Sequence, residues 1–342
     1  MRITALPFYE PFLKPILFSL DPELVHEMAL ATLARLSRIP WLLNVLSRSG
    51  DDRLNREIFG LRFPNPIGLA AGFDKNGMAL PAWEALGFGF VEIGTITAQG
   101  QVGNPRPRIF RIREMEALIN RLGFNNEGVE KIAARLEQLG GTSQRPKIPV
   151  GINIGKSKVV PLEQAASDYL RSFQRLQRLG DYFVLNVSSP NTPDLRKLQA
   201  GAAIGELFGE IQQENRGKPL LVKIAPDLTP EQLDHILAAA DEYRLAGVVA
   251  TNTTINQETI PQDKRQPGGL SGKPLSARSL EVLHHIKRHS SLPVISVGGI
   301  MNGDDAKQRF DAGAELVQIY TGLVFRGPRL VREIARCSLQ KE

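Results

Sequence analysis

The sequence has almost no cysteine. Cys337, close to the C-terminus, is the only one in 342 residues. A lone cysteine excludes a disulfide within the chain, and it excludes iron–sulfur clusters and structural zinc sites that cysteines would hold. It also favours a reducing compartment. We predict no metal site.

Long apolar runs are missing as well. No stretch of about 18 apolar residues occurs, so we expect no bilayer span. The N-terminus lacks the features of a signal or transit peptide. No Lys/Arg run with interleaved aromatics appears, which argues against nucleic-acid binding. The net charge of +6 suits anionic substrates or an anionic membrane surface, although many proteins with this charge bind neither.

Eight short apolar runs do occur, each followed by polar or glycine residues. They are Pro66–Ala70, Val91–Gly94, Val150–Ile152, Phe183–Leu185, Leu220–Val222, Gly247–Ala250, Val294–Val297 and Leu316–Ile319. Helix-like segments lie in most of the gaps, at Glu163–Leu179, Ala202–Glu214, Pro230–Tyr243 and Ser276–His289. This alternation predicts an α/β fold, a (β/α)8 barrel, because strands covered on both faces are apolar throughout. A barrel takes roughly 250 residues, so we expect a barrel at 51–342 and a helical extension at 1–50.

The residues after each strand should form the active-site mouth. The most informative of these segments is Asn186–Pro193, where amide and hydroxyl side chains follow a buried strand. An ordinary Asn/Ser/Pro turn would read the same way. Gly298-Gly299 and Tyr320-Thr321 follow the last two strands, where barrels commonly bind a phosphate. Lys223 at a strand end suits an anionic partner, a Schiff base or a structural ion pair.

The N-terminal extension is apolar on more than one face. Asp21-Pro22 predicts a helix that begins at Pro22 and runs to about Ser37. A second apolar segment, Phe8–Leu20, precedes it, and Pro15 within it predicts a kink or a late start. Two-sided apolarity would be explained by contact with the barrel on one face and with lipid or an apolar ligand on the other. A padding lid or a dimer interface would explain it equally well.

Taken together, these motifs resemble class 2, quinone-dependent dihydroorotate dehydrogenase. The resemblance rests on Ala70–Lys75, Glu92–Thr95, Ile119–Asn126, Asn186–Pro193, Val222–Leu228, Ala250–Thr254, Gly268–Gly272 and Val297–Ile300, and it extends from the N-terminal helices to the final helix. It implies oxidation of dihydroorotate to orotate in pyrimidine biosynthesis, with FMN as cofactor and a membrane quinone as acceptor.

The resemblance also implies site residues. FMN would contact Ala71, Gly72, Lys75, Thr95, Asn153, Asn186, Lys223, Thr251, Ser271, Gly272, Gly298, Gly299, Tyr320 and Thr321. The substrate would contact Lys75, Asn120, Arg121, Leu122, Gly123, Phe124, Asn186, Asn191, Asn252 and Thr253. Asparagine suits a cyclic ureide, because its amide offers both a donor and an acceptor.

Ser189 would be the base that removes the C5 proton while the C6 hydride moves to the flavin. Class 1 relatives carry cysteine there, so serine and the extension both indicate class 2. The same resemblance implies quinone-site roles for His26, Arg111 and Tyr320. It further implies a peripheral protein on the cytoplasmic face of the cell membrane, docked through its N-terminal helices, and we expect a monomer.

Three alternatives stay open at this point. One is a class 1 type FMN enzyme with a soluble acceptor such as fumarate or NAD. Another is a phosphate-binding barrel synthase or isomerase without redox chemistry. The third is a membrane-surface binding protein built on an inactive barrel.

Overall fold

Eight parallel strands form a closed barrel, as predicted. The computed structural model describes residues 9–46, 51–142, 145–192, 194–199, 201 and 203–339. The barrel order is β10-β12-β13-β3-β4-β7-β8-β9. The strands are β3 Ile67–Leu69, β4 Phe90–Ile96, β7 Val150–Ile154, β8 Tyr182–Asn186, β9 Leu220–Ile224, β10 Gly247–Ala250, β12 Val294–Val297 and β13 Leu316–Ile319. Each bound lies within two residues of the prediction.

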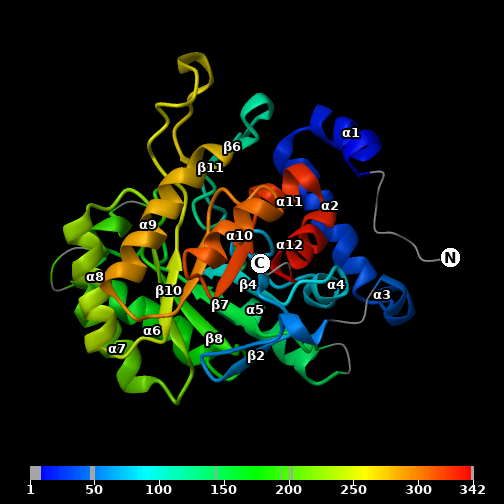
Figure 1. Cartoon of the computed structure of the whole chain (residues 1–342). Coiled ribbons are helices and arrows are strands. Elements are labelled where there is room, and N and C mark those ends of the chain that lie inside the picture. Colours follow the sequence, from blue (N-terminus) through cyan, green and yellow to red (C-terminus); the bar gives the residue numbers. More distant parts are fainter. Residues whose placement is uncertain are drawn as a thin grey trace.

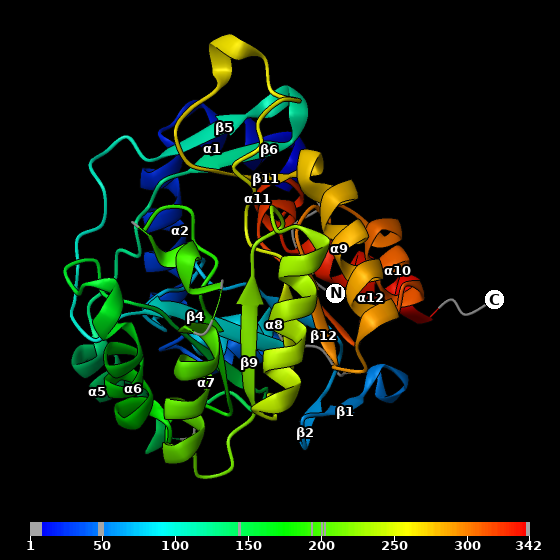
Figure 2. The ribbon, with the colours of Figure 1, turned by 90° about the vertical axis from the view of Figure 1, so that its left-hand side faces the viewer.

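Helices cover the outside of the barrel (Figures 1 and 2). They are α4 Leu80–Ala85, α5 Val129–Gly140, α6 Ala165–Leu176, α7 Ala203–Glu214, α8 Pro230–Glu242, α9 Ser276–His289, α10 Gly303–Asp311, α11 Thr321–Arg326 and α12 Arg329–Leu339. Short 3-10 helices lie at Asp52–Leu54, Arg113–Met115, Leu162–Gln164, Leu195–Gln199, Gln262–Lys264 and Lys273–Leu275. The four predicted helical segments are confirmed, except that Ala202 lies outside the described residues.

The two ends of the barrel are closed differently (Figures 1 and 2). At one end lies the hairpin of β1 Arg56–Ile58 and β2 Leu61–Phe63, and the fully buried Phe63 packs among the inward-facing residues of the strands. At the other end lies an antiparallel sheet in the order β11-β6-β5. Its strands are β5 Ile109–Ile112, β6 Ala117–Asn120 and β11 Gly269–Gly272. The hairpin end is therefore plugged by apolar side chains, while the sheet covers the end where the strands finish.

The N-terminal extension is helical. A π-helical turn, Tyr9–Leu13, leads into α1 Lys14–Ser19, and α2 Pro22–Leu36 and α3 Pro40–Leu46 follow. The Asp21 carboxylate caps α2 by accepting the backbone N–H groups of Glu23 (3.0 Å) and Leu24 (2.9 Å). The predicted start at Pro22 is thus confirmed. Pro15 stands in the first turn of α1, where its missing N–H costs nothing, and this is the late start that it predicted. Phe8 lies outside the described residues.

Polar contacts fix the extension to the barrel. The Glu23 carboxylate is buried and accepts from Arg108 Nε (2.9 Å) and Nη2 (2.7 Å). Tyr9 Oη donates to the Val324 carbonyl at 2.6 Å. Arg111 of β5 donates to the Leu17 carbonyl at 3.2 Å. These contacts hold α1 beside the β5–β6–β11 sheet (Figures 1 and 2).

Exposed apolar side chains concentrate on the same extension. Nine of the thirteen large apolar residues that are exposed in the described structure lie between positions 12 and 45: Phe12, Leu13, Ile16, Leu20, Leu24, Met28, Ile39, Trp41 and Val45. Trp41 is 68% exposed and Ile16 63%. Within the described ranges, no helix is long and apolar enough to cross a bilayer.

Candidate active site at the barrel mouth

A cavity lies at the carboxyl ends of the strands beneath the β5–β6–β11 sheet. Most of the predicted site residues line it. From the cofactor set these are Ala71, Gly72, Lys75, Thr95, Asn186, Lys223, Thr251, Ser271, Gly272, Gly298, Gly299, Tyr320 and Thr321. From the substrate set, Asn120, Leu122, Gly123, Phe124, Asn191, Asn252 and Thr253 join them, as does Ser189. The fold thus gathers residues that are 250 positions apart in sequence.

Four predicted residues stand outside this lining: Asn153, Arg121, Arg111 and His26, the last of which is described below with the quinone residues. Asn153 lies one layer deeper in the barrel, bonded to two residues of the lining. Arg121 points away from the cavity, because its guanidinium donates to the Pro107 carbonyl at 2.9 and 3.1 Å. Arg111 stacks on the Phe18 ring of α1 with its guanidinium carbon 4.6 Å from the ring centroid.

A chain of hydrogen bonds orients the amides of the cavity floor. Thr95 Oγ1 donates to Asn153 Oδ1 at 2.6 Å. Asn186 Nδ2 donates to Thr95 Oγ1 at 2.8 Å and to Asn153 Oδ1 at 3.1 Å. All three side chains are buried, and their mutual bonds decide which way each amide faces. The floor is therefore a preorganised array of donors and acceptors.

Lys223 forms an ion pair with the buried carboxylate of Glu92. Its Nζ lies 3.6 Å from Glu92 Oε1, inside the barrel. Glu92 also accepts from Asn153 Nδ2 (2.7 Å) and Gln318 Nε2 (2.5 Å). These partners come from three other strands, so Glu92 joins β4, β7, β9 and β13 at one point. The ammonium is positioned by this carboxylate while it faces the cavity.

Sequence reasoning missed the roles of Glu92 and Gln318. Both interrupt otherwise apolar strands, and that interruption was the available signal. Which strands they reach depends on barrel closure, which no local pattern reveals.

The loop after β8 carries Ser189 into the cavity. Ser189 Oγ accepts the backbone N–H of Asn191 at 3.2 Å, and the side chain is 95% buried. Asn191 Nδ2 donates to the Asn120 carbonyl on β6 at 3.1 Å. Asn252 Nδ2, from the segment after β10, donates to Ser188 Oγ at 3.0 Å across the end of β9. The hydroxyl is thereby held at a fixed place in the cavity.

Arg196, a residue that the sequence did not single out, fastens this loop. Its Nε donates to the Ser188 carbonyl at 3.0 Å, and its Nη2 donates to the Thr253 carbonyl at 3.0 Å. Its Nη1 pairs with Asp227 Oδ2 at 2.7 Å. One guanidinium thus links the segments that follow β8, β9 and β10. Only the folded loops bring these groups together.

Lys75 is the second cation of the cavity, and it is buried. Burial, with a further contribution from Arg108, lowers the pKa of Lys75 to about 8. The neighbouring Asp74 carboxylate accepts the backbone N–H groups of Met78 (2.8 Å) and Ala79 (2.9 Å) and Nε1 of Trp83 (3.0 Å). The Asp74 carboxylate is therefore occupied by these three hydrogen bonds, which leaves the Lys75 ammonium available to a ligand.

Glycine backbone and hydroxyls form the far wall. Gly298 and Gly299 have φ of 113° and 74°, which favours glycine. A Cβ on Gly299 would lie 2.3 Å from Ser276 Cα, so no side chain fits. Ser271 Oγ and Thr321 Oγ1 lie 2.9 Å apart beside them. Such a wall can accept a phosphate at close range.

The predicted quinone residues lie on the side of the extension. The His26 ring is 5.0 Å from the Phe73 ring, which is 5.1 Å from the Tyr320 ring of the cavity wall. Burial, and secondly the charge of Lys75, lowers the pKa of His26 to about 3. A neutral imidazole, a phenyl ring and a phenol therefore connect α2 to the cavity.

Comparisons with known proteins agree with this geometry. The dihydroorotate dehydrogenase family matches residues 53–340. A Gloeobacter violaceus protein named dihydroorotate dehydrogenase (quinone) is 52% identical over 326 residues, covering 94% of this chain and 91% of the relative. A Thermus thermophilus protein of the same name is 51% identical over 324 residues, covering 93% and 92%. The crystal structure of DHODH from Eimeria tenella in complex with ferulenol superposes with a TM-score of 0.86 at 36% identity, covering 94% of this chain and 93% of that one.

Proposed function

Because the chain belongs to the dihydroorotate dehydrogenase family, we propose that its barrel-mouth cavity binds FMN and dihydroorotate side by side. The protein is an oxidoreductase that oxidises dihydroorotate in pyrimidine biosynthesis with a quinone as acceptor. The resemblance seen in the sequence is confirmed, and the barrel without redox chemistry and the soluble-acceptor enzyme are set aside. The observation that carries the proposal is the convergence of two buried lysines, four asparagines and Ser189 on one cavity.

The residues fit FMN. The flat ring has room over Ala71-Gly72, and its polar edge would meet the Thr95–Asn186 floor and the Lys223 ammonium. The Gly298-Gly299 wall with Thr321 suits the phosphate. FMN, when bound, supplies the hydride acceptor. Lys223 would hold a positive charge at the edge of the bound flavin, where it would stabilise developing negative charge, and Glu92 keeps the ammonium in place.

The substrate sits in the part of the cavity nearest the β6 strand. Lys75 neutralises its carboxylate, and Asn120, Asn191 and Asn252 pair with the alternating N–H and C=O groups of its ring. Their amides are turned by neighbours, since Asn191 Nδ2 donates to Asn120 and Asn252 Oδ1 accepts the Thr253 N–H at 2.7 Å. Binding therefore requires little reorganisation of these side chains.

Ser189 is the base in this proposal. Its Oγ accepts one backbone N–H, from Asn191, and has lone-pair capacity left to take the C5 proton. A serine is a weak base, so the pocket must be dry and must offer a proton exit. We assign that exit to the region of Thr192, which is buried, and the cavity residue Phe124. The proton leaves between them through a water.

An absorbance experiment tests this function. The purified protein should carry about one non-covalent FMN per chain, and anaerobic dihydroorotate should bleach it. Lys223→Ala should weaken FMN binding or slow its reduction, because the charge at the flavin edge loses its counterion. A folded, colourless protein that takes up no added FMN would contradict the proposal.

The N-terminal extension carries the last part of the proposal, which concerns the quinone and the membrane surface. We assign quinone access to the side where His26, Phe73 and Tyr320 reach the cavity, and membrane-surface contact to the exposed apolar residues of α1–α3. Each such side chain buried in lipid contributes roughly 1.5–3 kcal/mol, so a handful suffices for reversible docking without a span. Arg111 then closes the contact between α1 and the sheet rather than touching the flavin.

A further inference from the structure

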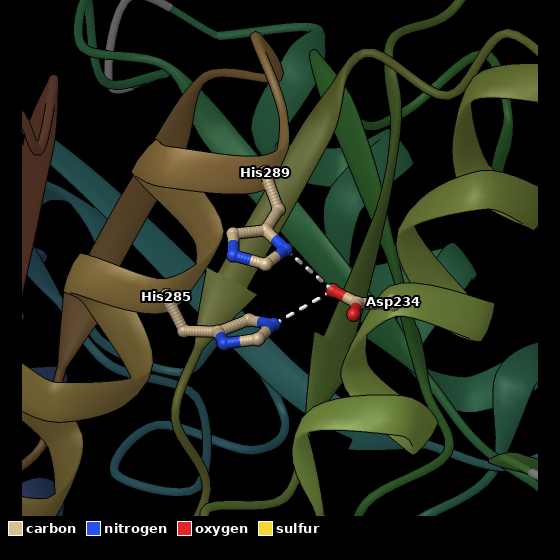
Figure 3. Close-up of side chains that lie close together, drawn as sticks. All are labelled: Asp234, His285 and His289. Carbon is tan, nitrogen blue, oxygen red and sulfur yellow. Dashed lines mark hydrogen bonds and ion pairs between the residues drawn. The ribbon is translucent and has the colours of Figure 1, made fainter.

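Two histidines and an aspartate meet on the outside of the barrel. Asp234 comes from α8, and His285 and His289 come from α9. Asp234 Oδ1 lies 2.7 Å from His285 Nε2 and 3.2 Å from His289 Nδ1 (Figure 3). One ligand atom of each residue lies within 4.8 Å of the other two. None of the three lines the active-site cavity.

The spacing of the histidines explains why they act as a pair. Positions i and i+4 lie on the same face of a helix, one turn apart. Their rings stack, with centroids 4.2 Å apart and planes inclined by 25°. Both rings turn toward α8, where Asp234 lies (Figure 3). Two imidazole nitrogens and one carboxylate oxygen therefore point at a common region between the two helices.

This donor set selects a class of ion. Imidazole nitrogen with carboxylate oxygen suits zinc and its neighbours in the first transition row, at bond lengths of about 2.0–2.2 Å. Calcium and magnesium prefer oxygen ligands alone. Glu231, one turn before Asp234 on α8, adds negative charge nearby. Its carboxyl pKa is lowered mainly by hydrogen bonds to its own backbone N–H and to Thr229, and slightly by the His285 imidazole.

We propose that Asp234, His285 and His289 bind one zinc-type divalent ion that ties α8 to α9. Water fills the remaining coordination position, since three protein ligands leave a tetrahedral ion open at the fourth. The site lies outside the chemistry of dihydroorotate oxidation. It would stabilise the barrel wall, because an ion that binds the folded chain and not the unfolded one raises stability by mass action.

A plain hydrogen-bonded trio is the competing explanation. In that case the imidazoles donate to Asp234 and no ion is needed. The pKa of Asp234 is lowered first by its hydrogen bond with His285, and that bond exists without an ion. Only metal titration separates the two.

The experiment uses the full-length, tag-free protein, because a histidine tag would itself bind the metal. Zinc is titrated calorimetrically at pH 7.5, and thermal unfolding is followed with and without zinc. We expect one zinc per chain and a raised unfolding midpoint. His289→Gln and Asp234→Asn should each weaken zinc binding by about tenfold or more. His284→Gln is the matched control, since His284 is an exposed neighbour on α9 that is not part of the trio, and it should bind zinc like the wild type.

Copper gives a second readout that does not depend on stability. The electron paramagnetic resonance spectrum of bound Cu²⁺ should show splitting by two imidazole nitrogens in the wild type and by one in His289→Gln. Dihydroorotate oxidation should be unchanged in every variant. Equal zinc affinity in His289→Gln and the wild type would place the ion elsewhere. No binding up to millimolar zinc would leave the hydrogen-bonded trio as the correct account.

Discussion

The barrel and the N-terminal extension bury their apolar residues in opposite ways. Within the described residues, helices α4–α12 expose no large apolar side chain, and the four exposed ones that belong to the barrel domain lie in its loops: Met78, Val102, Val159 and Ile255. The extension exposes nine over a much shorter stretch. Apolar surface left in water on this scale marks an interaction site rather than a folding defect.

The polar groups show the reverse pattern. In the barrel they are buried and bonded to one another, as in the Glu92–Lys223–Asn153 cluster. In the extension, polar groups fix the helices to the barrel, and one of these contacts is the buried ion pair between Glu23 and Arg108. The proposed function matches this division, with small polar ligands held in fixed geometry by the barrel and an apolar partner met by the extension.

The largest effect is expected inside the barrel. Ser189→Ala should slow anaerobic flavin reduction by dihydroorotate by ~10²–10⁴-fold, because no group is left to take the proton. Orotate binding should stay nearly intact, and Ser189→Cys should retain more activity than alanine. Stopped-flow absorbance is the measurement, and an alanine variant reduced at close to the wild-type rate would move the base to another residue.

The second-largest effect is expected at Glu23, which fixes helix α2 of the extension to the barrel. Glu23→Gln removes the charge that pairs with buried Arg108, and breaking a buried pair costs about 3–5 kcal/mol. We expect α2 to loosen, so that its amide hydrogens exchange faster and quinone reduction falls while flavin reduction by dihydroorotate persists. Glu27→Gln is the matched control: its partner Arg106 is mostly exposed, and such pairs contribute about 0–1 kcal/mol. Equal effects of the two variants would show that the buried pair is not the anchor.

The third-largest effect is expected at the exposed apolar side chains of the extension. Ile16→Ser should reduce binding to vesicles of zwitterionic lipid by about tenfold, because each such side chain contributes roughly 1.5–3 kcal/mol in lipid. Val159→Ser, at a side chain 75% exposed in a barrel loop, is the control and should bind like the wild type. Both variants should unfold within about 0.5 kcal/mol of the wild type. Vesicle co-sedimentation in moderate salt measures the difference, and a similar loss in both variants would exclude a specific docking face.

Acidity should weaken the fold through His26, a single buried side chain of the extension. His26 has a pKa of about 3 in the fold, against 6.5 for an ordinary imidazole, because burial disfavours its charge. The unfolded chain therefore takes up a proton below pH 6.5 that the folded chain refuses. Stability should fall as the pH drops from about 6.5 toward 3, by at most about 1.4 kcal/mol per unit. It should not change through this group above pH 7.

The comparison of the wild type with His26→Phe isolates this contribution. The unfolding free energy of the wild type minus that of the variant should fall as the pH drops from 7 to 5, because only the wild type has an imidazole to titrate. A difference that stays constant across this range would show that His26 is not held neutral in the fold.

Much of the barrel could be predicted from the sequence because each strand carries its own local signal. The alternation of apolar runs and polar ends located all eight strands, and Asp21-Pro22 marked the start of α2. The cavity lining followed because the carboxyl ends of parallel strands meet at one rim. Asparagine at several of those ends suits a cyclic ureide, and that assignment stays a prediction.

The residues that the sequence missed act across distances that it does not encode. Glu92 and Gln318 meet only because the barrel closes between β13 and β3. Arg196 joins three loops whose relative positions follow from the whole sheet. The sequence predicted no metal site, because the His285/His289 pair on α9 carries no metal signal until the fold brings Asp234 of α8 beside it.

The division between the two regions is tested most directly by measuring the two half-reactions separately in a chain that lacks residues 1–46. Retained flavin absorbance shows that its barrel is folded. Anaerobic stopped-flow should then find flavin reduction by dihydroorotate close to the wild-type rate, and reoxidation by a long-chain quinone reduced to near the background rate. Reoxidation at the full wild-type rate in this truncated, folded protein would contradict the account and make the extension mere padding.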